Sequence, residues 1–264
     1  MMNPMEKKTA LITGGSSGIG LEFARQLAAS GYDLVLVSNR GDELAMAKAA
    51  LSKETAVEIT TVEADLALPG AAEGILKECG EKGLEPEILI NNAGMFFMEY
   101  LSPGMLPKVR TMMDLHMRAA TELCILFGEE MKRRGHGRIL NVASMAARIP
   151  APGIAVYSAS KAYLKCFGKS LSYEMRPYGV TVTTLCPAAV DTGLYPLGEG
   201  LRRTGRRIGL IWSPERLVRR ALKGMFRGRR VVSPSLVNVI LPPLIAILPG
   251  RIIDRLGMRL VNRK

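Results

Sequence analysis

A glycine-rich turn near the N-terminus is the first segment whose composition suggests chemistry. It reads Thr13-Gly14-Gly15-Ser16-Ser17-Gly18-Ile19-Gly20, and it follows an apolar run and opens a helix-like segment. Glycines let the backbone turn tightly and approach a pyrophosphate, which the positive end of the helix then stabilises. The turn predicts a dinucleotide-binding site, although a strand–helix connection of this kind can also stand without a ligand.

A serine, a tyrosine and a lysine in the middle of the chain could move a proton. Ser144, Tyr157 and Lys161 are separated by 13 and four residues. Residues i and i+4 share one face of a helix, so the phenol and the ammonium are expected to point the same way. A tyrosine pKa near ~10 suits a proton shuttle poorly at neutral pH, and a nearby ammonium lowers such a pKa by favouring the phenolate. A Tyr-x-x-x-Lys pair alone is often an exposed helix face, but beside the other motifs it predicts acid–base chemistry.

Short apolar runs that alternate with helix-like stretches would position these groups. The runs are uniformly apolar, as expected of parallel strands that are covered on both faces. Repeated strand–helix units predict an α/β fold, a Rossmann-like doubly wound parallel sheet with helices on both faces. The predicted strands are Thr9–Thr13, Leu34–Ser38, Glu58–Glu63, Ile88–Asn91, Gly137–Val142, Thr181–Cys186 and Arg230–Ser233, and the predicted helices include Gly20–Ser30, Lys108–Arg133 and Pro214–Phe226.

Together these motifs resemble the short-chain dehydrogenase/reductase family, over roughly residues 8–233. The resemblance rests on the glycine-rich turn, on Asn91-Asn92-Ala93-Gly94 after the fourth strand, and on the serine, tyrosine and lysine. It implies an oxidoreductase that moves a hydride between a nicotinamide cofactor and a carbonyl or hydroxyl carbon. In that scheme Ser144 hydrogen-bonds the carbonyl oxygen, Tyr157 delivers or removes the proton, and Lys161 tunes Tyr157 and holds the nicotinamide ribose.

The resemblance implies further contacts to the cofactor. Asp65-Leu66 matches the family's adenine contact, and Pro187-Ala188-Ala189-Val190-Asp191-Thr192 matches the segment that contacts the nicotinamide carboxamide. Ala188 stands where glycine is usual, and one extra methyl group is expected to be tolerated. The expected cofactor-binding residues are Gly14, Ser16, Ser17, Gly18, Ile19, Gly20, Asn39, Arg40, Asp65, Leu66, Asn92, Ala93, Gly94, Tyr157, Lys161, Pro187, Val190 and Thr192.

His116 departs from the family pattern at the fourth catalytic position, where an asparagine is usual. In the family, the main-chain carbonyl of that residue holds a water that links the lysine to solvent. A backbone role survives the substitution, and an imidazole could itself relay protons. A third interpretation is that His116 occupies a helix face without a catalytic role. The departure leaves the proton relay open and the reaction class unchanged.

The end of the second predicted strand is where the cofactor would be selected. Members that prefer NAD place an acid there to bind the ribose 2′-hydroxyl, whereas this chain continues with Asn39 and Arg40. A fork-shaped guanidinium could pair with a 2′-phosphate, unless Arg40 is simply a solvated charge. We expect NADP(H) rather than NAD(H).

The loops expected to line the substrate pocket are apolar. They follow Gly94 and Ser144, and a third segment runs between residues 193 and 212. Such a lining suits a bulky lipophilic substrate, although some of its side chains will belong to the core. The candidates are Met95, Phe96, Phe97, Met98, Met145, Ile149, Leu194, Leu197, Leu210, Ile211 and Trp212.

The net charge of +12 is concentrated in the last quarter, because residues 201–264 carry 16 Lys/Arg and two acids. We expect residues 1–234 to form a single catalytic domain and residues 235–264 to form an apolar and basic extension. An amphipathic helix with arginines every four residues could lie on an anionic membrane surface or pack on another subunit. Four prolines argue against a membrane-spanning helix, and the basic stretch lacks the aromatic residues typical of nucleic-acid binding. The arginines are Arg251, Arg255, Arg259 and Arg263.

These features predict an NADP(H)-dependent enzyme that interconverts a ketone and a secondary alcohol on a lipophilic molecule, working as a reductase. Hydroxysteroids and 3-ketoacyl or 3-ketosphinganine-type lipids are the expected substrate classes. The alternative is a catalytically weak member that senses NADP(H) and binds a partner or membrane through its basic last quarter. Four widely spaced cysteines and a polar N-terminus predict a cytoplasmic protein, peripheral to the membrane at most, and we expect a homodimer or homotetramer without metal or nucleic acid.

Overall fold

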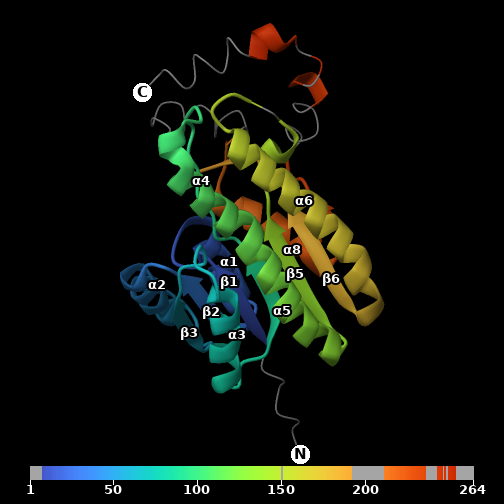
Figure 1. The fold of residues 1–264 in the computed structure, drawn as a ribbon. Coiled ribbons are helices and arrows are strands. Elements are labelled where there is room, and N and C mark those ends of the chain that lie inside the picture. The colour runs from blue at the N-terminus through green and yellow to red at the C-terminus, as the bar shows by residue number, and fades with distance from the viewer. Residues whose placement is uncertain are drawn as a thin grey trace, which may run out of the picture.

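A seven-stranded parallel sheet forms the centre of the protein in a computed structural model (Figure 1). The structure describes residues 8–149, 151–191, 211–235, 243–245, 247 and 249–253. The strand order is β3-β2-β1-β4-β5-β6-β9, and every neighbouring pair is parallel. The strands are β1 (Thr9–Thr13), β2 (Asp33–Ser38), β3 (Ile59–Glu63), β4 (Pro86–Asn91), β5 (Gly137–Val142), β6 (Val180–Leu185) and β9 (Val231–Val232). A separate two-stranded pairing joins β7 (Ala189–Val190) to β8 (Ile211–Trp212).

Helices connect the strands and cover the sheet. They are α1 (Gly18–Ala28), α2 (Gly41–Glu54), α3 (Ala71–Glu81), α4 (Leu106–Met113), α5 (Ala119–Arg134), α6 (Ala155–Met175) and α8 (Pro214–Phe226). The prediction of a helix at Lys108–Arg133 is wrong in one respect, because the helix is not regular throughout. A π-helical turn at Asp114–Arg118 lies between α4 and α5. That turn carries the predicted site residue His116.

Alternate side chains of each strand enter two different cores, because strand side chains point to opposite faces of a sheet. In β1, Ala10 and Ile12 pack with residues of α1, α2 and α8, whereas Leu11 packs with residues of α3, α5 and α6. Both faces are therefore buried, which explains why the strands are apolar on both sides. The predicted doubly wound sheet with helices on both faces is confirmed.

The sheet has a switch point between β1 and β4. From β1 the chain proceeds to β2 on one side, and after β3 it returns to add β4 on the other side. The loops after such a pair of strands diverge and leave a crevice at their carboxyl ends. Here those loops are the glycine-rich turn after β1 and the segment from Asn92 to Gly94 after β4, so the two motifs face each other.

The expected extension at 235–264 lies mostly outside the described residues. Its described parts include helical turns at 243–245 and 250–253, and of its four regularly spaced arginines only Arg251 is described. Within the described parts of the chain, the structure contains no helix with the length and apolar character needed to cross a membrane. Membrane or subunit contact by this extension stays a prediction.

Gly20→Ala should destabilise the turn after β1. A Cβ at this position would collide with the Gly14 carbonyl oxygen and would lie 2.6 Å from Asn92 Nδ2. Because overpacking of this kind costs ~1–3 kcal/mol, we expect urea unfolding to show a loss of about 2 kcal/mol. Gly74→Ala in α3 is the matched control, since its Cβ would meet nothing within 4 Å. That control should gain ~0.5–1 kcal/mol from helix propensity, and similar losses in the two variants would contradict the argument.

Candidate active site

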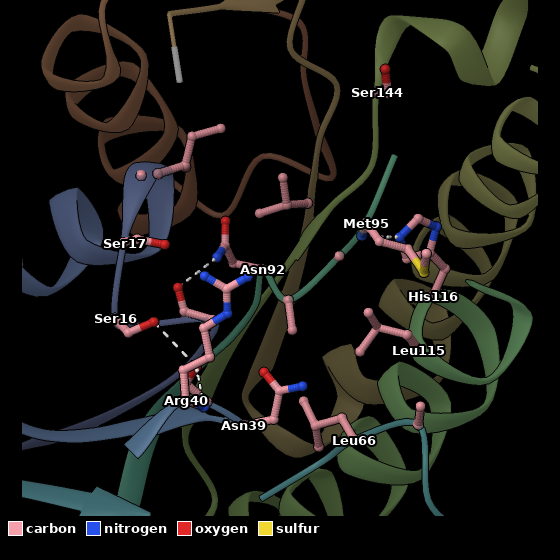
Figure 2. A pocket seen from close by; sticks show the side chains of 18 of the residues that line it. Ser16, Ser17, Asn39, Arg40, Leu66, Asn92, Met95, Leu115, His116 and Ser144 are labelled. Carbon is pink, nitrogen blue, oxygen red and sulfur yellow. Dashed lines mark hydrogen bonds between the residues drawn. The ribbon is translucent and has the colours of Figure 1, made fainter. Parts of the chain in front are cut away.

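A cavity of about 620 Å³ lies at the carboxyl ends of the strands. Figure 2 shows Ser16, Asn39 and Arg40 at one end of it, and Met95, His116 and Ser144 at the other. Of the predicted site residues, Gly20 does not line the cavity and packs behind the turn, and Thr192 lies outside the described residues. The predicted residues that line it are Gly14, Ser16, Ser17, Gly18, Ile19, Asn39, Arg40, Asp65, Leu66, Asn92, Ala93, Gly94, His116, Ser144, Tyr157, Lys161, Pro187 and Val190.

The turn after β1 presents the start of α1 to the cavity. Gly14 and Gly18 have φ angles of 63° and 55°, which residues with a Cβ rarely adopt. Ser17 is the N-cap of α1, but its side chain makes no capping hydrogen bond. The cap therefore leaves the N–H groups of the first turn available, and such groups bind phosphate. This geometry fits the pyrophosphate of a dinucleotide.

Asn92 fastens the glycine-rich turn to the end of β4. Its Nδ2 donates to the carbonyl oxygens of Thr13 at 3.0 Å and Gly14 at 3.3 Å. The Thr13 hydroxyl accepts from the N–H groups of Asn92 and Ala93 at 2.9 and 3.0 Å. These bonds hold the two loops of the switch point together, and the loops form one wall of the cavity.

The end of the cavity beside β2 contains two polar residues that the sequence analysis missed. Ser38 and Glu43 line it together with Arg40, whose guanidinium forms an ion pair with Glu43. The spacing of three residues between Arg40 and Glu43 at a helix start was the available signal, since such pairs meet on one helix face. No acid stands at the end of β2, where Ser38 is followed by Asn39.

Tyr157 and Lys161 lie one turn apart on α6, as predicted, and both are buried. The Lys161 ammonium lies 5.8 Å from the centroid of the Tyr157 ring and donates to the Val142 carbonyl oxygen at 3.0 Å. Burial lowers the pKa of Lys161 to about 8, because an ammonium group loses its hydration there. The side chain is therefore a cation at neutral pH that can release its proton in mildly alkaline solution.

Ser144 lies just beyond β5 and lines the cavity. It caps the short 3₁₀ helix Met145–Arg148, and its Oγ accepts a hydrogen bond from the Ala146 N–H at 3.1 Å. A hydroxyl that accepts such a bond still has its own proton to offer. The group can thus donate to an oxygen held in the cavity.

Apolar side chains surround the Tyr157 ring. The Phe96 ring meets it edge-on, with centroids 4.9 Å apart. Of the predicted pocket residues, Met95 lines the cavity, whereas Ile211 and Trp212 are buried, Trp212 in the core beside α8. Leu194, Leu197 and Leu210 lie outside the described residues. The apolar cluster comprises Met95, Phe96, Phe97, Met105, Val109, Met112, Ala146, Ile154, Val156 and Tyr157.

His116 connects the loop after β4 to α6. Its Nε2 accepts a hydrogen bond from the Met95 N–H at 3.0 Å, so the ring proton must be on Nδ1. Nδ1 lies 2.9 Å from Ser160 Oγ, and the Ser160 hydroxyl donates to the Tyr157 carbonyl oxygen at 2.8 Å. Burial and, secondarily, the Lys161 charge lower the pKa of His116 well below its ordinary value. Both ring nitrogens therefore already take part in hydrogen bonds within the protein. This arrangement disfavours the proposed role of the imidazole as a proton relay.

The comparisons with known proteins agree with the geometry. The profile of the short chain dehydrogenase family matches residues 8–196. The very-long-chain 3-oxoacyl-CoA reductase of Macaca fascicularis is 29% identical over 95% of this chain and 78% of its own length. The protein of the same name from Mus musculus is 30% identical over 74% of this chain, which spans 63% of that relative. A short-chain dehydrogenase from Sphingobium yanoikuyae, solved in complex with NADPH, has a TM-score of 0.77 at 29% identity and covers 92% of this chain and 96% of its own.

The His116 ring should stay neutral where an ordinary imidazole takes up its proton. In ¹H–¹⁵N spectra recorded between about pH 8 and pH 6, around the ordinary pKa of ~6.5, we expect its signals to keep the Nδ1–H pattern. The chain contains only one other histidine, His136, so His116→Phe assigns the signals without ambiguity.

The same variant should lower the free energy of unfolding by about 2–4 kcal/mol, because the Met95 N–H and the Ser160 hydroxyl lose a buried partner. If the His116 signals instead titrate between about pH 8 and pH 6, the ring does exchange a proton at working pH.

Proposed function

The chain belongs to the short-chain dehydrogenase family, whose members are oxidoreductases, and we propose that it reduces the 3-oxo group of a long acyl thioester with NADPH. The observation that carries the proposal is the position of Tyr157, whose ring lies in an apolar cluster while Lys161 and Ser144 line the same cavity. The names of the two curated relatives, both very-long-chain 3-oxoacyl-CoA reductases, support this substrate class.

Three side chains of this site would act on the substrate carbonyl. When bound, the nicotinamide supplies the hydride for the carbonyl carbon. Ser144 would hold the carbonyl oxygen by donating its hydroxyl proton, which orients the carbonyl and stabilises the charge that develops on it. Tyr157 would then donate the phenol proton to that oxygen and complete the alcohol. The cation of Lys161 favours the phenolate that remains, and its ammonium would also hold the nicotinamide ribose.

The cluster around Tyr157 favours an acyl chain as the bulk of the substrate. Its partly buried members keep some apolar surface accessible near the reacting phenol, and Met95 among them lines the cavity; they are Met95, Phe96, Val109, Ala146, Ile154 and Val156. An aliphatic chain gains free energy from each methylene that such a surface removes from water. The competing substrate class is a fused-ring ketone such as a ketosteroid, which would use the same surface.

NADPH is the proposed hydride donor because of the residues at the end of β2. Arg40 lines the cavity there, and neither Ser38 nor Asn39 is an acid that would accept a ribose 2′-hydroxyl. A guanidinium can pair with two oxygens of a phosphate at once. The Sphingobium yanoikuyae relative was solved with NADPH, which supports the same choice.

Catalytic efficiency should rise with the length of the acyl chain. Each buried methylene contributes ~0.8 kcal/mol, so we expect kcat/KM to increase about two- to fourfold per added carbon until the apolar surface is covered. The measurement follows NADPH absorbance with 3-oxoacyl thioesters of increasing length and with a ketosteroid. A flat length series, or faster reduction of the steroid, would point to the competing class.

Tyr157→Phe should abolish most turnover while NADPH still binds. The substitution removes the transferable proton and keeps the ring packed on Phe96, and general acids contribute ~100- to 10,000-fold. Tyr163→Phe is the matched control on the same helix, because Tyr163 is exposed and its hydroxyl pairs with Thr121. If the Tyr157 variant kept more than a third of the activity, the catalytic assignment would fail.

The alkaline limb of the pH profile should reflect Lys161. Its pKa is lowered to about 8, so the ammonium is present below that pH and is lost as the pH rises through it. We therefore expect kcat/KM for reduction to fall above about pH 8, since this parameter reports ionisations of the free enzyme. In Lys161→Arg the guanidinium keeps its charge, so any remaining activity should lose this limb. A limb at the same pH in the variant would assign it to another group.

A further inference from the structure

A carboxylate of the protein occupies the corner of the cavity beside β2. Glu43 Oε2 accepts a hydrogen bond from Ser16 Oγ at 3.1 Å, and Glu43 Oε1 forms the ion pair with Arg40. Ser38 Oγ lies 3.1 Å from Ser16 Oγ, and it accepts a hydrogen bond from the main-chain N–H of Arg40 at 3.3 Å. Ser16 and Arg40 lie at the same end of the cavity in Figure 2. One carboxylate therefore bridges a hydroxyl from the turn after β1 and a guanidinium from the start of α2.

We propose that Glu43 is a built-in competitor of the cofactor's 2′-phosphate and determines how strongly the protein prefers NADPH to NADH. The inference rests on the proposed use of NADP(H). A hydroxyl and a guanidinium are the donors that a phosphate would use, and the carboxylate already accepts from both. Two anions cannot hold the same donors side by side without repulsion. NADPH therefore has to displace Glu43 from Ser16 and Arg40.

The start of α2 directs Glu43 into this corner. Arg40 is the N-cap with an extended backbone, so Glu43 falls in the first helical turn, three residues later. Asp42, its neighbour in that turn, is exposed and does not line the cavity. The Arg40 hydrogen bond lowers the pKa of the Glu43 carboxyl below its ordinary value, so the group is charged at neutral pH. The competing charge is thus present under the conditions in which a cofactor would bind.

Glu43 should affect the two cofactors in opposite directions. The 2′-phosphate of NADPH carries up to two negative charges that the carboxylate repels. NADH has a 2′-hydroxyl instead, and a carboxylate can accept a hydrogen bond from that hydroxyl without leaving the corner. Glu43 therefore weakens the binding of NADPH and strengthens the binding of NADH. The preference for NADPH over NADH is then smaller than Arg40 alone would produce.

Titration calorimetry of the intact protein with 2′,5′-ADP and 5′-AMP tests the proposal, because the two probes differ in the 2′-phosphate alone. Glu43→Gln keeps the size of the side chain and an acceptor for Ser16 but removes the charge. We expect the dissociation constant of 2′,5′-ADP to fall about 3- to 15-fold, the range set by screened repulsion at close distance. The dissociation constant of 5′-AMP should stay the same or rise. With the whole cofactors, the dissociation constant of NADPH should fall in the variant and that of NADH should not.

Asp42→Asn is the matched control, because it removes one carboxylate from the same helical turn outside the Ser16–Arg40 contact. It should change either affinity by less than about twofold, as expected of a solvent-screened charge.

Four outcomes would decide against the proposal. If the protein prefers 2′,5′-ADP to 5′-AMP but Glu43→Gln does not strengthen it, Glu43 is not the competitor and the use of NADP(H) stands. If neither protein distinguishes the two probes, the use of NADP(H) fails as well. An equal gain for both probes, or the same gain in Asp42→Asn, would reveal a general effect of charge.

Discussion

Burial of a parallel sheet on both faces is the constraint from which the position of the site follows. With helices against each face, the central strands are buried along most of their length and have little surface on which to present polar side chains to solvent. Groups that bind charge or move protons therefore gather where the strands end, and the switch between β1 and β4 opens that edge at one place. The hydrogen bonds from Asn92 to Thr13 and Gly14 tie together the two loops that form one wall of this opening.

Two basic side chains are buried within this opening, and only one of them keeps its proton. Lys161 donates to the Val142 carbonyl oxygen, and its lowered pKa of about 8 still leaves it charged at neutral pH. A second cation beside it would meet both desolvation and repulsion, and these two effects lower the pKa of His116. The imidazole thus supplies hydrogen bonds without charge. The lysine supplies the only charge of this pair, next to the phenol that it is proposed to tune.

The parts of the molecule that could be predicted are those set by neighbours in the chain. β1, β5 and α8 coincide with their predicted ranges, and Tyr157 and Lys161 share a face because four residues make about one helical turn. The spacing of three residues could have indicated the pair of Glu43 with Arg40, but the contact of Glu43 with Ser16 could not be recognised in this way, since Ser16 lies 27 positions away. The His116 tautomer likewise depends on Met95 and Ser160, 21 and 44 positions distant. Contacts of that range follow from tertiary packing, which local periodicity does not describe.

The π-helical turn at Asp114–Arg118 makes this stretch of chain more sensitive to length than to composition. A π turn holds about one residue more than an α turn, so a one-residue deletion there could leave a continuous, regular α-helix. In that regular helix α4 and α5 would keep their faces, because the deletion removes the one residue by which the π turn exceeds an α turn. Met112 would therefore stay in the apolar cluster around Tyr157, whereas the residues of the turn itself would change direction and the ring at position 116 would lose its hydrogen bond with the Met95 N–H. The extra residue thus serves to position His116, and its removal should cost that contact rather than the packing of the two helices.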